Sequence, residues 1–352
     1  MADDKTPLIQ RPIAGPMSGA KKLGVGIALL LLPAGAAVTA WILKQGEDRG
    51  NADLEKSFNY DIDVKGMRTV DPALVTYKEV GKIETGMESP RRIAVGADGQ
   101  IIVGGDRVVR VVQADGRVSK SLAISGEATA VAAGPDGTIY VGMKDRIARY
   151  PAGQFSAIVT QWEPLAKDSH ITSIAVAKDA VYVADAGRLA GRVLKFDLAG
   201  KFLGEIAAKD DAKGIPGILT PSPHMDVAVA DDGNIWVANP GHRQMELYSP
   251  DGTFQRYWGS AGTTIETFLG CCNPSDFALL SNGRIVTAEK GIARVKIYQS
   301  DGHFQSVVAT PEQFGGNRAG LDLATDAQGR VLLLEPGTRG IRVFARVDEG
   351  KP

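Results

Sequence analysis

Three aspartates stand at the same place in three consecutive repeats of the sequence. Asp226, Asp276 and Asp322 each come directly before an apolar run, in the segments MDVAV, SDFAL and LDLAT. If the repeats surround an axis, these carboxylates converge, and converging carboxylates raise each other's pKa or recruit a cation such as Ca²⁺. The alternative is that each side chain bonds the backbone of its own turn, as Asp often does. The pattern predicts either a ligand- and metal-binding centre or three structural turns.

Cys271 and Cys272 are adjacent and are the only cysteines. Such a pair can build neither a disulfide framework nor a CxxC-type zinc site. In an oxidising compartment it can close a vicinal disulfide, which is easily reduced and offers a flat platform to a planar ligand. Lys290 would lower a thiol pKa or bind an anion if it faces the same side. We predict a disulfide between Cys271 and Cys272; the alternative is two buried thiols that act as small apolar side chains.

A second set of polar side chains ends the second apolar run of the later repeats, and it consists of Asp185, Asn239, Glu289 and Glu335. Three of them are followed by an arginine, namely Arg192, Arg294 and Arg342. Carboxylate–arginine pairs recur in repeat architectures, so we predict structural ion pairs here. Asn239 has no arginine in the corresponding place and is predicted to be free for a ligand.

Six repeat units must position these residues. Each contains two apolar runs joined by a turn, as in SPRRIAVGADGQIIVGG, and most continue into a further run with a second turn. The units begin at Ser89, Glu127, Ser169, Ser222, Asn273 and Asn317. A period of about 38 to 53 residues with two turns suits the four strands of a propeller blade.

The sixth unit lacks a fourth strand, because the sequence after Val347 is too short to hold one. The segment Leu74–Thr85 precedes the first unit and has the apolar and polar texture of that strand. We predict that it closes the ring and removes an exposed sheet edge. The expected fold is all-β: a six-bladed β-propeller over residues 74–347, followed by a tail at 348–352.

The composition excludes several functions. Lys and Arg number 40 against 41 Asp and Glu, so no overall field attracts nucleic acid, and no nucleic-acid partner is predicted. The sequence contains no GxxxxGK[ST] loop for a nucleotide and no GxSxG elbow for a nucleophilic serine. An NTPase and a serine hydrolase are therefore not expected.

Residues 23–43 (LGVGIALLLLPAGAAVTAWIL) carry no charge, and as a helix they reach about the 30 Å of a bilayer core. Two lysines precede them, whereas charges of both signs follow. The positive-inside rule predicts a cytoplasmic tail at 1–22, a single transmembrane anchor at 23–43 and a linker at 44–73. The propeller would then lie outside a bacterial inner membrane, in the periplasm or beyond. The alternative is a signal peptide that is cleaved after Ala40.

The units resemble the NHL repeat, in which a Gly-Ile-Ala-Val stretch, an Asp-x-x-Gly turn, a Val-Ala-Asp and an Arg-Ile-x-Val-Phe strand follow one another. The resemblance covers residues 74–347. The fifth unit, with GCCNPSDFALLSNGRIVTAEKG, is similar to bacterial membrane-anchored NHL proteins that carry Gly-Cys-Cys-Asn-Pro at the start of a blade. The resemblance implies a six-bladed propeller but no single activity, because propellers include enzymes and binding modules.

The favoured function is a membrane-anchored binding scaffold. Its channel mouth, near the cysteine pair, would hold a small ligand or a protein partner from a membrane complex. The residues predicted to bind the ligand are Asp226, Asn239, Cys271, Cys272, Asp276, Lys290 and Asp322.

The alternative function is enzymatic. Glu88, Asn239, Asn273 and Asp276 are similar to the ligands of calcium-dependent lactonase propellers, which implies a metal-dependent hydrolase. A redox-accessory propeller that uses the cysteine pair is a further form of this alternative. His170 and His224 resemble zinc-binding histidines of the peptidylglycine amidating lyase propeller, but the third is missing.

Overall fold

The computed structural model describes residues 64–105, 107–154, 160–163, 165–187, 190–314, 320–335 and 337–347. The predicted cytoplasmic tail at 1–22, the anchor at 23–43 and the tail at 348–352 lie outside the described residues, as does the linker before residue 64. In the described part of the chain, no helix has the length and apolar character that a membrane crossing requires.

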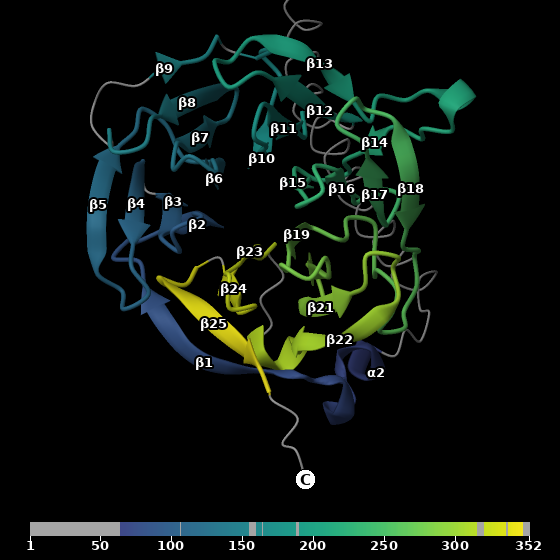
Figure 1. Cartoon of the computed structure of the whole chain (residues 1–352). Helices are drawn as coiled ribbons and strands as arrows, with labels where there is room; N and C mark the ends of the chain where they lie inside the picture. The colour runs from purple at the N-terminus through teal and green to yellow at the C-terminus, as the bar shows by residue number, and fades with distance from the viewer. Residues whose placement is uncertain are drawn as a thin grey trace, which may run out of the picture. The chain divides into compact units, whose positions relative to one another are not determined.

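The described strands form six antiparallel sheets that surround a central channel, which confirms the predicted six-bladed propeller (Figure 1). Blade 1 contains β2 (Pro90–Val95), β3 (Ile101–Gly105), β4 (Val108–Val112) and β5 (Val118–Ala123). Blade 2 contains β6 (Ala130–Ala133), β7 (Ile139–Met143), β8 (Arg146–Tyr150) and β9 (Thr160–Gln161). Blade 3 contains β10 (Ile171–Val176), β11 (Val181–Asp185), β12 (Ala190–Phe196) and β13 (Phe202–Ile206), and the short β14 (Ile218–Leu219) also pairs with β12.

The remaining three blades repeat this order. Blade 4 contains β15 (Val227–Val229), β16 (Ile235–Asn239), β17 (Gln244–Tyr248) and β18 (Phe254–Trp258). Blade 5 contains β19 (Asp276–Leu279), β20 (Ile285–Glu289), β21 (Arg294–Tyr298) and β22 (Phe304–Ala309). Blade 6 contains β23 (Asp322–Thr325), β24 (Val331–Leu334), β25 (Gly340–Arg346) and β1 (Tyr77–Glu84). Short helices lie outside the blades: α2 (Val64–Arg68), η1 (Pro72–Leu74), η2 (Asp211–Lys213) and η3 (Pro311–Phe314).

The turn between the two innermost strands fixes the register of a blade. In blade 2, the Asp136 carboxylate accepts the N–H of Thr138 at 3.0 Å, and Gly137 has a φ of 79°. A side chain that bonds two residues ahead, followed by a residue that tolerates positive φ, makes a tight hairpin. The Asp and Gly pattern of the sequence therefore marks true strand ends.

Strand β1 closes the ring, as the sequence predicted. It pairs antiparallel with β25, from Tyr77 opposite Arg346 to Glu84 opposite Gly340 (Figure 1). Thr76 also donates its N–H to the Val307 carbonyl of blade 5 at 3.2 Å. The blade that ends the chain is thus completed by a strand from the start of the propeller.

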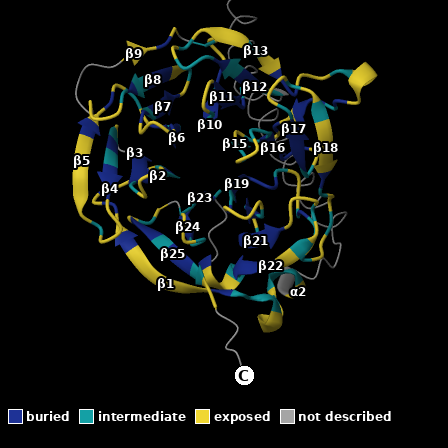
Figure 2. Cartoon of the chain, viewed as in Figure 1, coloured by how far each residue is buried: buried dark blue, intermediate teal, exposed yellow. Residues whose placement is uncertain are grey.

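The hydrophobic core lies between neighbouring blades. Val295 and Ile297 of blade 5 cluster with Leu323 and Leu333 of blade 6, and the other junctions have clusters of the same kind. Strands β16 and β20 are buried at all five positions. The rim strand β5, by contrast, is largely exposed (Figure 2). Inner strands that are covered on both faces account for the nearly continuous apolar runs of the repeats.

Ile83 tests the closure, because it lies on β1, is 7% exposed and packs between blades 6 and 1. We expect Ile83→Ala to lower the free energy of unfolding by about 2–5 kcal/mol, the usual cost of removing a buried isoleucine side chain. Val80→Ala on the same strand is the control, because Val80 is 49% exposed and its loss should cost at most about 0.5 kcal/mol. Urea denaturation of both variants measures the difference. Equal effects would contradict a closing role for β1.

Candidate functional site at the channel mouth

Asp226, Asp276 and Asp322 line one cavity of about 260 Å³ in the channel. Each carboxylate accepts the backbone N–H of the innermost strand in the next blade. The distances are 2.8 Å from Asp226 to Phe277, 2.9 Å from Asp276 to Leu323, and 2.6 Å from Asp322 to Ile93. The expectation that each Asp bonds only its own turn is therefore wrong, although Asp226 also accepts the N–H of Val227 at 2.8 Å. The three side chains therefore link neighbouring blades by hydrogen bonds.

Burial controls the protonation of these carboxyl groups. It raises the pKa of Asp226 to about 6. It also raises the pKa of Asp276 well above its usual value, and the neighbouring Asp226 and Asp322 add to that shift. The pKa of Asp322 is raised by burial as well, while Arg92 opposes the shift from 2.9 Å away. One guanidinium thus faces three buried carboxyl groups.

No group of three or more His, Cys, Asp or Glu side chains in the described ranges is arranged to hold a metal ion. Each of the three aspartates already uses a carboxylate oxygen to accept a backbone N–H, and Asp322 also accepts from Arg92. Ca²⁺ binding by Asp226, Asp276 and Asp322 stays a prediction.

The second set of polar residues forms the ion pairs that the sequence predicted. Arg192 pairs with Asp185, and Arg294 lies 2.8 Å from Glu289. Arg342 lies 3.8 Å from Glu335 and closer, at 2.7 Å, to Glu79 of β1. These pairs join neighbouring strands within a blade.

Asn239 differs from its prediction as a free ligand-binding residue. Its side chain is fully buried, and its amide nitrogen donates to Glu246 at 2.7 Å and to the Gly217 carbonyl at 2.9 Å. Its amide oxygen accepts the N–H of Leu219 at 3.0 Å. Glu246 is the side-chain partner of Asn239, so the lack of an arginine does not leave Asn239 free.

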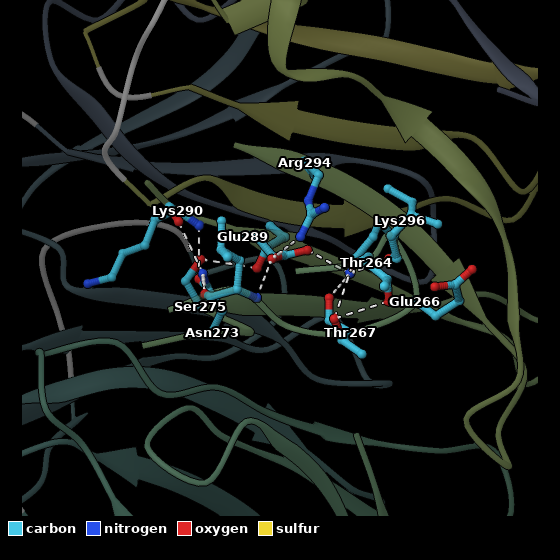
Figure 3. Close-up of polar contacts among 12 residues, drawn as sticks. Thr264, Glu266, Thr267, Asn273, Ser275, Glu289, Lys290, Arg294 and Lys296 are labelled. Atoms are coloured by element: carbon cyan, nitrogen blue, oxygen red, sulfur yellow. Dashed lines mark hydrogen bonds and ion pairs between the residues drawn. The ribbon is translucent and has the colours of Figure 1, made fainter. Parts of the chain in front are cut away.

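Glu289 of blade 5 has a second cationic partner that sequence reasoning missed. The Lys296 ammonium is fully buried and lies 2.6 Å from the Glu289 carboxylate (Figure 3). It also donates to the carbonyls of Ile265 and Thr267 at 3.0 and 2.8 Å. Burial lowers the pKa of Lys296 to about 8. The only signal in the sequence is a lysine between two apolar residues of β21.

The cysteine pair lies at the start of blade 5 and reaches the surface. The two Sγ atoms are 3.1 Å apart, both residues are free thiols, and Cys271 is exposed. The alternative of two buried thiols in the core is therefore wrong. The disulfide itself stays a prediction.

A larger cavity of about 590 Å³ opens at the mouth of the channel. Every blade contributes a side chain to it: Arg92, Thr129, His170, His224, Lys290 and Asp322. Gly320 leaves room for one of them, because a Cβ on Gly320 would stand 2.7 Å from Cε1 of His224. A shared site for His170 and His224 could not be predicted from the sequence, because the residues that line the cavity with them belong to other blades.

Hydrogen bonds fix both the backbone and the ammonium group of Lys290. Its N–H donates to the Asn273 amide oxygen at 2.9 Å, and its carbonyl accepts from the Asn273 amide nitrogen at 3.0 Å. Its ammonium donates to the Ser222 hydroxyl at 2.6 Å and is directed away from the Glu289 cluster (Figure 3). Within the described ranges, no carboxylate forms an ion pair with Lys290.

The two histidines that line this cavity with Lys290 are neutral at physiological pH. Burial lowers the pKa of His224 to about 4, and the charges of Lys290 and Arg92 act in the same direction. Burial also lowers the pKa of His170, with Arg92 as the next cause. In addition to the ion pairs of Arg91 with Glu127 and of Arg92 with Asp322, the mouth therefore presents an ammonium and two neutral imidazoles. These groups can donate hydrogen bonds to an anion.

Several solved structures share this fold. A streptogramin B lyase aligns with a TM-score of 0.53 and 11% identity, over 79% of this chain and all of that one. A protein of unknown function from Bacteroides thetaiotaomicron gives 0.55 and 15%, over 77% and 75%. The WD40 propeller domain of Doa1 gives 0.51 and 14%, over 77% and 98%. No protein-family model and no curated protein matches the chain. At such identities the likeness shows a β-propeller fold and nothing finer.

The raised pKa of Asp226 predicts a pH-dependent stability. Its folded-state pKa of about 6 exceeds the usual 3.8, so its contribution is complete below about pH 3.8 and is lost as the pH rises through 6. Relative to Asp226→Asn, the wild-type protein should lose up to about 3 kcal/mol of unfolding free energy between pH 4 and pH 7. Urea denaturation across that range measures this loss.

Asp251→Asn is the control for this titration. Hydrogen bonds from Ser249 and Thr253 lower the pKa of this exposed residue to about 2. Its difference from wild type should therefore stay flat between pH 4 and pH 7. A flat difference for Asp226→Asn as well would show that the buried carboxyl keeps an ordinary pKa.

Proposed function

We propose that this chain is a membrane-anchored, extracytoplasmic propeller of NHL-like repeats that binds a small anionic ligand at the mouth of its channel. The observation that carries the proposal is Lys290, a cation that lines a 590 Å³ cavity without a carboxylate partner among the described residues. Cavities of about 300–1,000 Å³ suit small molecules. A ligand carboxylate or phosphate would supply the missing negative charge.

Electrostatics favours an anion over a neutral ligand. Arg92 is already paired with Asp322, and Arg91, which also lines the cavity, lies 3.5 Å from Glu127. Among the described residues Lys290 is therefore the cation of this cavity that a ligand can neutralise. A hydrogen bond between an ammonium and an anion is about twice as strong as one between neutral groups, and it strengthens as water leaves the cavity. The neutral His224 ring offers a further polar contact without a second positive charge to be buried.

The hydrolase alternative has less support. Of its four supposed metal ligands, Asn239 is buried against Glu246, and Asn273 is bonded to Leu269 and Lys290. Asp276 holds the N–H of Leu323. None of these three side chains lines the mouth cavity. A binding role therefore fits the arrangement better than metal-dependent hydrolysis.

We infer the cellular location of this function from the sequence alone. Residues 23–43 are uncharged and of spanning length, with lysines on the N-terminal side. A propeller held outside the membrane with its channel mouth open would suit an accessory subunit that presents a ligand to a membrane complex.

The charge of Lys290 should determine anion affinity. We expect Lys290→Gln to weaken the binding of inorganic phosphate and of succinate at least about ten-fold, the loss of one charge-assisted hydrogen bond. Isothermal titration calorimetry at low ionic strength measures both ligands. Lys178→Gln is the matched control, because Lys178 is exposed on the turn between β10 and β11. Failure of wild-type protein to bind either anion would end the proposal.

The anchor has its own test. Full-length protein should remain in the membrane fraction after an alkaline carbonate wash, and a chain without residues 1–43 should be released. A C-terminal alkaline phosphatase fusion should be active, because that enzyme folds only outside the cytoplasm. N-terminal sequencing adds a check: a mature form that begins at Trp41 would show a cleaved signal peptide instead.

A further inference from the structure

The dithiol at the start of blade 5 reaches the surface. Cys271 and Cys272 Sγ lie 3.1 Å apart, and Cys271 is open to solvent. The hydrogen bond with Cys272 raises the pKa of Cys271, while the Lys290 charge acts in the opposite direction. The Lys290 ammonium is therefore close enough to influence the thiol pair as well as the cavity.

The next residue ties the dithiol to Lys290. Asn273 is 2% exposed, and its side chain holds both the N–H and the carbonyl of Lys290, at 2.9 and 3.0 Å. The same amide nitrogen donates to the Leu269 carbonyl at 2.6 Å. The segment 269–273 and the backbone of Lys290 thus form one hydrogen-bonded unit through Asn273 (Figure 3). Within this unit Cys271 is exposed and Cys272 is partly exposed.

We propose that Cys271 and Cys272 are a redox-modification site, and that closure of their disulfide weakens anion binding by displacing Lys290 through Asn273. The modification stands on the cysteine geometry alone, whereas its effect on binding rests on the proposed function. Thiol–disulfide exchange with a small external disulfide is the reaction.

The exchange balances in two steps. One cysteine thiolate attacks a sulfur of the external disulfide, forms a mixed disulfide and releases the first small thiolate. The neighbouring cysteine loses its proton to solvent, and its thiolate attacks the protein sulfur of the mixed disulfide. The second small thiolate leaves as the vicinal disulfide closes. The two cysteines are oxidised, and one external disulfide is reduced to two thiols.

Ring closure acts on the residue that follows it. In the dithiol state the Asn273 side chain meets all three of its backbone partners at 2.6–3.0 Å. The closed ring fixes ψ of Cys271 and φ of Cys272, one residue before Asn273. We expect the resulting change in the backbone to draw the Asn273 amide away from Lys290. Loss of one such hydrogen bond is worth about a five-fold change in an equilibrium.

The test uses the full-length protein, reduced or treated with 2-hydroxyethyl disulfide. Denaturing alkylation with iodoacetamide and intact-mass analysis count the thiols: two in the reduced protein and none after oxidation are expected. The affinity for inorganic phosphate should fall about five-fold on oxidation. The Cys271→Ser, Cys272→Ser double variant is the control and should bind phosphate equally under both conditions.

A second readout keeps the test independent of the ligand. Acetylation of Lys290 by acetic anhydride, followed by peptide mass spectrometry and normalised to exposed Lys178, should become faster when the disulfide releases the Asn273 contact. Two free thiols after oxidant treatment would overturn the modification site. A closed disulfide with unchanged Lys290 reactivity would overturn the coupling. If neither form binds phosphate or succinate, the proposed function fails, while the acetylation rate still decides the coupling.

Discussion

Hydrogen bonds between the innermost strands of neighbouring blades hold the channel of this propeller together. An innermost strand pairs with its blade on one side only, so alternate N–H groups on its other edge have no strand to meet. Asp226, Asp276 and Asp322 supply the acceptors, each for the following blade. Burying these carboxyl groups costs free energy, as their raised pKa values show, but a buried N–H without a partner costs about 1–3 kcal/mol as well.

The hydrogen bond from Ile93 to Asp322 joins the last blade to the first and differs from those of Asp226 and Asp276. Asp322 bonds Ile93 and also pairs with Arg92, which in turn donates to the Thr129 carbonyl of blade 2. One guanidinium therefore joins blades 6, 1 and 2 at the channel. At the rim, β1 completes blade 6 and then leads directly into blade 1. Closure is thus made twice, by strand pairing outside and by an ion pair inside, and the second contact brings Arg92 to the mouth cavity.

An interaction could be predicted from the sequence where both of its residues belong to the same blade and stand at a regular spacing. Turn spacing is local, so the six blades and the closing segment at 74–85 could be predicted. The Asp185, Glu289 and Glu335 pairs could be predicted too, because each arginine follows within the same blade. The role of Asn239 could not be predicted, because its partner Glu246 is an acceptor two residues beyond the position opposite Asn239, where blades 3 and 5 have an arginine. His224, Lys290 and Arg92 line one cavity but come from three different blades. No regular spacing along the chain indicates that they lie together.

Glu289 and Lys290 are consecutive, yet they serve different surroundings. Glu289 is fully buried with Arg294 and Lys296, whereas Lys290 lines the mouth cavity. Buried ion pairs are weak sources of stability, because desolvation offsets much of their attraction. Their better use is to fix position: the Glu289 carboxylate also accepts the N–H of Leu269 at 3.0 Å, and Asn273 bonds the backbone of Lys290. The segment 269–273 is therefore fastened at its two ends to two adjacent residues. The buried cluster of Glu289, Arg294 and Lys296 thereby helps to position the backbone from which the Lys290 ammonium extends to the channel mouth.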